Sequence, residues 1–271
     1  MAQSGVVLFA VKIEEAELLE AWCAARAIVD RTGRWPAVGG DIYPAPSIDV
    51  SPLECCFGRE RSTGGRDWER FGEQLFGELR AAQEHAWKPS PLTDRLQYQL
   101  GRTQSGYGAA PRPAEILERF ASDVRDVDLE HWLLEWEEAR RPTTRPLESG
   151  HLDWFFDPSC ALMFYPTPSG PCSIAYEPFY GERDMPGLTT RRLIIILEFW
   201  RRIFGAELVA NWGTMLQFVV ARPPTTLEQG WALAIQQALV APDTIIGPGV
   251  PLRDHARTLI ARPTWLLHCR P

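Results

Sequence analysis

Apolar runs and helical spacings alternate over the first forty residues of the chain. Residues 6–11 form a short apolar run suited to a buried strand, and residues 14–30 repeat apolar side chains at the spacing of a helix face. Gly33 and Pro36 end this helix, and residues 36–43 favour a second strand. The start of the chain therefore predicts a strand, a helix and a strand.

The next hundred residues alternate between loops and helices. Residues 44–66 are rich in Pro, Gly and Ser and predict a long surface loop, and residues 101–113 are again typical of a loop. Helices are predicted over residues 67–87 and 126–140. Residues 141–150, RPTTRPLESG, have the composition of a linker. We take them as the boundary between an N-terminal α/β region, residues 1–145, and a C-terminal α+β domain, residues 150–271.

The pattern is sharper in the C-terminal part. Strands are predicted at residues 161–165 and 172–176 as a hairpin, then at 206–210, 216–221 and 265–269. Helices are predicted at residues 189–204 and 253–260, and Thr225 with Glu228 forms a capping box for a helix between these two. The order of elements predicts an α+β fold, a mainly antiparallel sheet with helices packed on it.

Composition and charge narrow the classes of function. The formal net charge is −7 and the pI is about 5.4, which disfavours nucleic acid and anionic membranes as partners. No apolar run reaches the length of a membrane span, and the start of the chain lacks the basic region of a signal peptide. Lys12 and Lys88 are the only lysines, a bias typical of GC-rich bacterial genomes. We expect a cytoplasmic bacterial protein.

One long stretch of the second half carries a family resemblance. Residues 199–243 read FWRRIFGAELVANWGTMLQFVVARPPTTLEQGWALAIQQALVAPD. From about residue 175 to 271 the chain resembles a bacterial family known as domain of unknown function 4253, which brings no established activity with it. The positions that match the family pattern are Phe204, Gly205, Ala206, Glu207, Arg222, Pro223, Pro224, Pro242 and Asp243.

The chain departs from that family pattern at three places. Residues 181–186 keep Asp184 and Pro186 but lack the family's Trp, Asn and Cys, and Ala241 replaces the Cys before Pro-Asp. Residues 268–270 stand where the family closes on Trp-Trp-Asp. The resemblance therefore implies that any polar site built from these segments is altered in this chain.

Asp184 and Asp243 are the acidic residues that the resemblance singles out, and each lies beside or close to a proline. If the fold brings them within a few ångströms, paired carboxylates can act as general acid and base or hold a divalent cation. Glu207 is a third candidate. The alternative is structural, because an acid next to proline more often caps a helix or fixes a turn. Motifs for serine hydrolases, phosphate loops and dinucleotide binding are absent from the sequence.

The histidines and cysteines do not form a ligand pattern. None of the five histidines has the spacing of a zinc site, so we expect no metal and no cofactor. Cys55 and Cys56 are adjacent in a predicted loop, where they are either a reactive thiol pair or, as we favour, two small residues packed under the loop.

The chain contains eleven tryptophans, and most of those on helix faces suit the core. Trp35 and Trp154 lie at predicted element ends or in loops, where aromatic residues can anchor a protein partner. Our first interpretation is a non-enzymatic protein-binding module, as an immunity or regulatory partner. The alternative is a hydrolase-like or metal-dependent enzyme that uses Asp184, Asp243 and Glu207. A structural subunit of a larger assembly is a third possibility.

Overall fold

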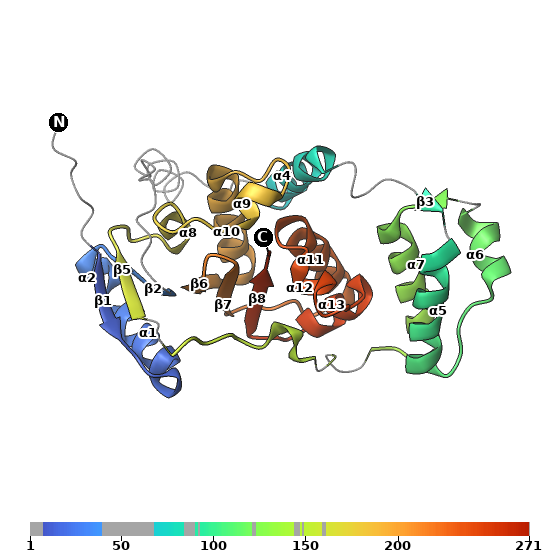
Figure 1. Cartoon of the computed structure of the whole chain (residues 1–271), viewed down its shortest axis with the longest axis horizontal. Coiled ribbons are helices and arrows are strands. Elements are labelled where there is room, and N and C mark those ends of the chain that lie inside the picture. The colour runs from blue at the N-terminus through green and yellow to red at the C-terminus, as the bar shows by residue number, and fades with distance from the viewer. Residues whose placement is uncertain are drawn as a thin grey trace.

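A six-stranded sheet organises the molecule, with strand order β1-β5-β2-β6-β7-β8 (Figure 1). The computed structural model describes residues 8–39, 68–83, 90–91, 93–120, 123–143, 147, 149–158 and 161–270. The strands of the sheet are β1 Phe9–Lys12, β2 Trp35–Gly39, β5 Ala161–Tyr165, β6 Ala206–Asn211, β7 Met215–Val220 and β8 Thr264–His268. Only β2 and β6 pair in parallel; the other neighbours are antiparallel. The predicted α+β class is confirmed.

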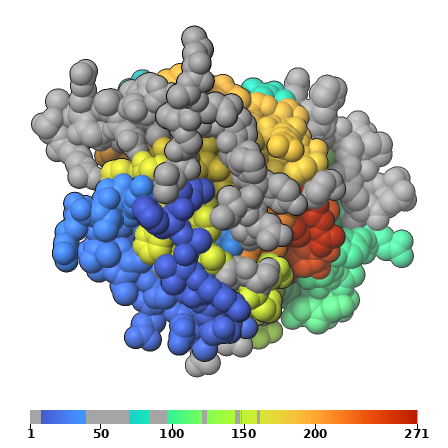
Figure 2. Space-filling view, turned by 60° about the vertical axis from the view of Figure 1, so that its left-hand side comes forward, coloured from blue at the N-terminus to red at the C-terminus, as the bar shows by residue number. Residues whose placement is uncertain are grey.

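Strands from both sides of residues 141–150 share this sheet. β5 has β1 on one side, with Phe9 opposite Phe164, and β2 on the other, with Trp35 opposite Tyr165. Figure 2 shows the N-terminal residues, in blue, lying against the yellow residues of β5 and its surroundings. The division into two domains, residues 1–145 and 150–271, stays a prediction.

The predicted hairpin over residues 161–176 is wrong in its second strand. Its place is taken by a short helix, α8 Gly170–Ser173, which begins where the Ser169 side chain accepts the Cys172 N–H and Pro171 occupies the first turn. A serine cap followed by proline is a strong helix start, and it outweighs the apolar run that follows. β5 therefore pairs with the two N-terminal strands.

The main core lies between the C-terminal strands and the helices α4 Trp68–Ala82, α10 Thr190–Phe204, α11 Leu227–Val240 and α13 Leu252–Leu259. Trp200 of α10 is fully buried, and its ring lies against Phe76, Phe218 and Trp265. Its indole N–H donates to Gln236 of α11 at 2.8 Å. The core is therefore assembled around large aromatic rings, and the indole N–H of Trp200 is satisfied within it.

Two helix ends show how local chemistry places these elements. Gly205 ends α10 in the left-handed conformation (φ +63°), as the sequence predicts. The cap of α11 differs from the prediction by one residue, because Thr226 accepts the Gln229 N–H at 3.2 Å and Gln229 accepts the Thr225 N–H at 2.9 Å. Gln229 therefore takes the role that we assigned to Glu228, and the cap lies one residue further along the chain than predicted.

A helical unit is inserted between β2 and β5 (Figure 1). It consists of α5 Thr93–Tyr107, α6 Pro113–Phe120 and α7 Asp126–Glu138, with its own small core around Ile116, Leu129 and Leu133. The predicted loop over residues 101–113 is wrong for 101–107, which are helical. Gly101 and Gly106 suggested a break, but a glycine costs a helix only about 1 kcal/mol and packing outweighs it.

The remaining described elements are short or lie at the periphery. They are η1 Glu15–Glu17, α1 Leu18–Ala27, α2 Val29–Thr32, the strand pair β3 Ser90–Pro91 and β4 Asp123–Val124, η3 Gly150–Leu152, α9 Gly181–Asp184 and α12 Asp243–Ile246. Among the residues that the structure describes, no helix combines the length and the apolar character needed to cross a bilayer.

Candidate functional site

Buried charges join the helical unit to the C-terminal helices. We call this contact, between α5 and α7 on one side and α12 and α13 on the other, the seam. Arg253 of α13 is 1% exposed, and its guanidinium lies 2.7 Å from Glu130 Oε2 and 3.0 Å from Glu137 Oε1. Its backbone N–H also donates to Glu130. An arginine held by two carboxylates of α7 therefore fixes how α7 lies on α13.

Arg257, one turn further along α13, extends this network. Its guanidinium lies 2.7 Å from Glu137 Oε2 and 3.1 Å from Glu138 Oε1. Burial raises the pKa of Glu130 even though Arg253 opposes the shift. Such charges are stable inside a protein only when each has a partner. The seam therefore depends on ion pairs and leaves room between the helices.

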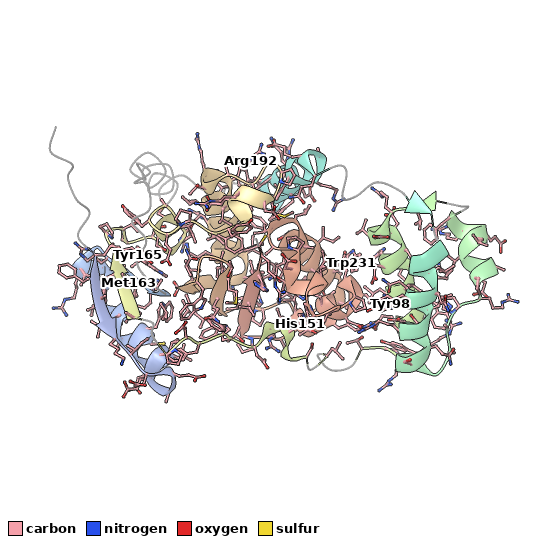
Figure 3. The ribbon with its side chains drawn as sticks, viewed as in Figure 1. Tyr98, His151, Met163, Tyr165, Arg192 and Trp231 are labelled. Carbon is pink, nitrogen blue, oxygen red and sulfur yellow. The ribbon has the colours of Figure 1, made fainter. Side chains whose placement is uncertain are left out.

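An apolar cavity of about 450 Å³ lies in the seam. A few polar side chains reach it, among them that of Tyr98, which extends from α5 to the segment before α13 (Figure 3). Ile246 on its wall is 67% exposed, the highest value among the large apolar residues described. The apolar lining is Val127, Leu129, Met185, Ala238, Pro242, Ile245, Ile246, Val250, Pro251 and Leu252. This is the composition of a small-molecule pocket.

A second cavity, of about 970 Å³, lies on the other side of Tyr98. Tyr98 lines both cavities, and its hydroxyl donates to Gly249 O at 3.1 Å, which ties α5 to the segment before α13. The wall of this second cavity is charged, with arginines from α5 and α13. The seam therefore contains two neighbouring cavities of opposite character.

Asp184 and Asp243 lie near the same end of the sheet. Asp243 Oδ2 accepts the Arg270 N–H at 2.8 Å, just after β8. Burial raises the pKa of the Cys269 thiol to about 12, and the charges of Asp243 and Asp184 add to this shift, which places both acids close to it. Asp243 thus caps a turn, while the neighbouring residues Met185 and Pro242 line the apolar cavity. The segments that carry the family resemblance border that cavity.

Glu207 lies at the other end of the sheet. It is opposite Val219 of β7, whereas His268, near Asp243, is opposite Met215. Val219 and Met215 are four residues apart along β7, a distance of roughly 13 Å. Glu207 also pairs with Arg26 of α1 at 2.6 Å. The structure therefore does not bring the three candidate acids together, and a catalytic role for them stays a prediction.

The two candidate tryptophans bond to carbonyls inside the protein. Trp35 is 2% exposed and its indole N–H donates to Leu208 O at 3.1 Å. Trp154 is half-buried and donates to Trp265 O at 3.2 Å. Their role as binding anchors stays a prediction. Cys55 and Cys56 lie outside the described residues.

A chain of polar side chains that the sequence did not suggest runs into the core. His255 is fully buried, with Nδ1 2.9 Å from His151 Nε2 and Nε2 2.9 Å from Gln237 Oε1. His151 Nδ1 lies 2.6 Å from the Ser149 hydroxyl. Burial lowers the pKa of His151 to about 4 and that of His255 to about 3, so both rings are neutral at pH 7. No spacing signal could reveal a pair so far apart in the chain.

Glu177 is a second group that sequence analysis missed. It accepts the Tyr165 hydroxyl and lies against Gly39, where an added Cβ would be 2.9 Å from Glu177 Oε2. Burial raises the pKa of Glu177 to about 7, opposed by the hydrogen bond from Tyr165. This acid sits where the parallel strands β2 and β6 end and can gain or lose a proton near neutral pH.

Metal ligation finds no support in the described part of the chain, where no three His, Cys, Asp or Glu side chains are grouped as a metal site requires.

The comparisons with known proteins found a match for one segment of the chain. Residues 162–268 match the family model Domain of unknown function (DUF4253), which confirms the resemblance of the C-terminal part. Curated proteins and solved structures gave no significant match.

Proposed function

We propose, from the premise that residues 162–268 match a family without an assigned activity, that the protein is a binding module for a small apolar ligand. The apolar cavity of the seam carries this proposal. Its volume of about 450 Å³ lies within the range of roughly 300–1,000 Å³ that is usual for ligand pockets. Ile246 on its wall gives the ligand an apolar point of entry.

The polar groups around this cavity are already engaged, which argues for an apolar ligand. Gln83 donates to Leu239 O at 2.7 Å, and the Tyr98 hydroxyl donates to Gly249 O. Gln99 and Glu130 both hold Arg253. A ligand with many polar groups would have to break these hydrogen bonds to satisfy its own. An apolar ligand needs no hydrogen bonds, because its transfer from water into the cavity is itself favourable.

An acid-base enzyme receives less support from the same geometry. Glu207 is paired with Arg26 far from Asp243, and Asp243 already accepts a backbone N–H. The Cys269 thiol, with its raised pKa, is protonated at neutral pH and therefore a poor nucleophile.

Titration with the neutral fluorescent probe N-phenyl-1-naphthylamine tests the proposal. Ala238 lies on the cavity wall and is 8% exposed, so Ala238→Met should fill part of the cavity and weaken probe binding about tenfold, a loss of about 1.4 kcal/mol. The matched control is Ala232→Met, at an exposed position of the same helix α11, which should bind the probe as the unchanged protein does.

Thermal unfolding of the same two variants separates binding from folding. Because a methionine that enters an existing cavity adds contacts without overpacking, Ala238→Met should fold with an unchanged or higher Tm. A probe that does not bind, or that binds Ala238→Met as tightly as Ala232→Met, contradicts the proposal.

A protein partner, such as the target of an immunity or regulatory protein, is the second candidate function. The edge strand β1 favours it, because Phe9 is 55% and Val11 is 53% exposed. Open sheet edges can take up an added strand from a partner. A bacterial source and a cytoplasmic location remain part of this proposal.

Co-purification from a bacterial lysate tests this second function. A specific partner should be lost when Phe9 and Val11 are both changed to Lys. The same partner should still bind the control variant Leu117→Lys. Leu117 of α6 is 50% exposed, about as much as Phe9 and Val11. A partner that both variants retain, or the absence of any partner, contradicts binding at β1.

A further inference from the structure

The larger cavity of the seam has a wall with an excess of positive charge. Four arginines line it, Arg102, Arg141, Arg253 and Arg257, against two acidic residues, Glu137 and Asp254. The chain as a whole carries a net charge of −7, so this wall differs in sign from the rest of the molecule. A concave surface of this kind concentrates anions.

The four arginines differ in how firmly they are held. Arg253 and Arg257 are 1% and 3% exposed and bind carboxylates of α7 at 2.7 Å, so their charge is largely balanced inside the protein. Arg102 on α5 is 39% exposed at its side chain, and its contacts with Asp254 and Gly249 O are 3.4 Å and 3.3 Å. Charge-assisted hydrogen bonds are usually about 2.7–2.9 Å long. Arg102 is therefore only loosely bound.

Arg141 supplies a second exposed cation on the wall of the same cavity. It follows the end of α7 and is exposed, and none of the ion pairs between described side chains includes it. A guanidinium offers five N–H donors, so Arg102 and Arg141 can both turn toward a bound anion.

Two tyrosines add flat apolar surface beside these cations. Arg102 lies 6.0 Å from the ring of Tyr98, and Arg257 lies 5.5 Å from the ring of Tyr107. At about 970 Å³ the cavity is much larger than a bare inorganic ion needs and is of the size that accepts an organic molecule.

From this arrangement we propose that the larger cavity binds a small organic anion, with a ring between the two tyrosines and a phosphate or carboxylate group against Arg102 and Arg141. This site is separate from the apolar cavity, and the proposal does not depend on that cavity being occupied. The seam would then bind two different ligands, an apolar molecule in the smaller cavity and an organic anion in the larger one.

Calorimetric titration of the full chain with three naphthalene probes tests the proposal. 1-Naphthyl phosphate and 1-naphthoate share a ring and differ in the anion, and 1-naphthalenemethanol is their neutral counterpart. In Ala238→Met protein, where the partly filled apolar cavity binds a neutral ring weakly, at least one of the two anions should bind about ten times more tightly than the alcohol, because only an anion forms ion pairs with the guanidinium groups. Which anion binds best distinguishes a phosphorylated from a carboxylated ligand.

Variants then assign the binding to named residues. Arg102→Gln with Arg141→Gln should weaken binding of the preferred anion about tenfold or more. Arg140→Gln is the matched control, because Arg140 is adjacent to Arg141 but stacks on Trp136, 3.3 Å from its ring centroid. Ala238→Met, which fills part of the apolar cavity, should also leave anion binding unchanged, so the two sites can fail independently.

Two outcomes overturn the proposal. One is equal or undetectable binding of the anions and the neutral alcohol. The other is binding of the preferred anion that the double arginine variant retains, or that Arg140→Gln weakens as much. Circular dichroism of each variant excludes unfolding as the cause, since both substituted arginines are on the surface.

Discussion

The sheet core and the seam are built from different interactions. Around Trp200 the molecule is held by close packing of aromatic and aliphatic side chains, with 0% exposure at Leu193, Ile196 and Trp265. At the seam the principal contacts are ion pairs of Arg253 and Arg257 with α7, and two cavities lie beside them. Close packing leaves no space for a ligand, whereas charged contacts between helices do. The comparison therefore points to the seam as the functional region.

The largest effect is expected from Arg253→Met in the seam. The change leaves Glu130 without its cation and removes one of the two arginines from Glu137, so it should lower the free energy of unfolding by about 5 kcal/mol. Urea unfolding measures this value. The control is Arg125→Met, which removes an exposed ion pair with Asp128 and should cost less than about 1 kcal/mol. Equal costs for the two variants would mean that the buried network does not hold the seam.

Trp200→Ala probes the sheet core in the same way. Removing a fully buried indole should cost about 4 kcal/mol, because the space that it leaves cannot close completely. Unlike Arg253→Met, it should leave anion binding at the seam in place in the folded fraction. Loss of anion binding in folded Trp200→Ala protein would show that core and seam are not independent.

The neutral histidine pair predicts a loss of stability in acid. The pKa of His255 is about 3 in the folded protein and about 6.5 in the unfolded chain. Between these two pH values, His255 therefore takes up a proton only in the unfolded chain. The stabilisation is fully present above about pH 6.5 and decreases as the pH falls, by about 2 kcal/mol at pH 5. Urea unfolding at pH 7 and pH 5 measures it, and His255→Gln should be less sensitive to pH. An unchanged slope in that variant would contradict a buried neutral ring.

The smallest effect is expected when both charges of a seam pair are removed together. Glu130→Leu combined with Arg253→Met should recover most of the stability lost in Arg253→Met alone and come within about 1 kcal/mol of the unchanged protein. A double variant as unstable as Arg253→Met would show that Glu137, not Glu130, is the partner that matters.

Local patterns in the sequence predicted most helices and strands of the sheet core, and the helices α7 and α13 of the seam, but not the contacts that form across the seam. The spacing of Leu193, Ile196 and Trp200 predicts α10, and Gly205 predicts its end, because both signals depend on neighbours in the chain. Helix α5 was partly missed, since Gly101 and Gly106 weaken a helix that packing of the helical unit then stabilises. Tertiary contacts decide such segments, and they are not visible in local spacing.

The candidate site was harder to predict for the same reason. Arg253 meets Glu130 across 123 residues of chain, and His151 meets His255 across 104. None of these residues lies in a local sequence pattern that predicts its partner. The family resemblance did direct attention to residues 184–186 and 242–243, and two of these residues, Met185 and Pro242, line the apolar cavity.

Methyl NMR with the probe N-phenyl-1-naphthylamine tests the central claim most directly. If the apolar cavity is the binding site, adding the probe should shift the methyl signals of Met185, Val250 and Leu252, which line it, and leave those of Leu193 and Ile196 in the sheet core unchanged. Shifts confined to other regions, such as Val11 on the edge strand, or no shifts at all, would contradict a ligand site in the seam.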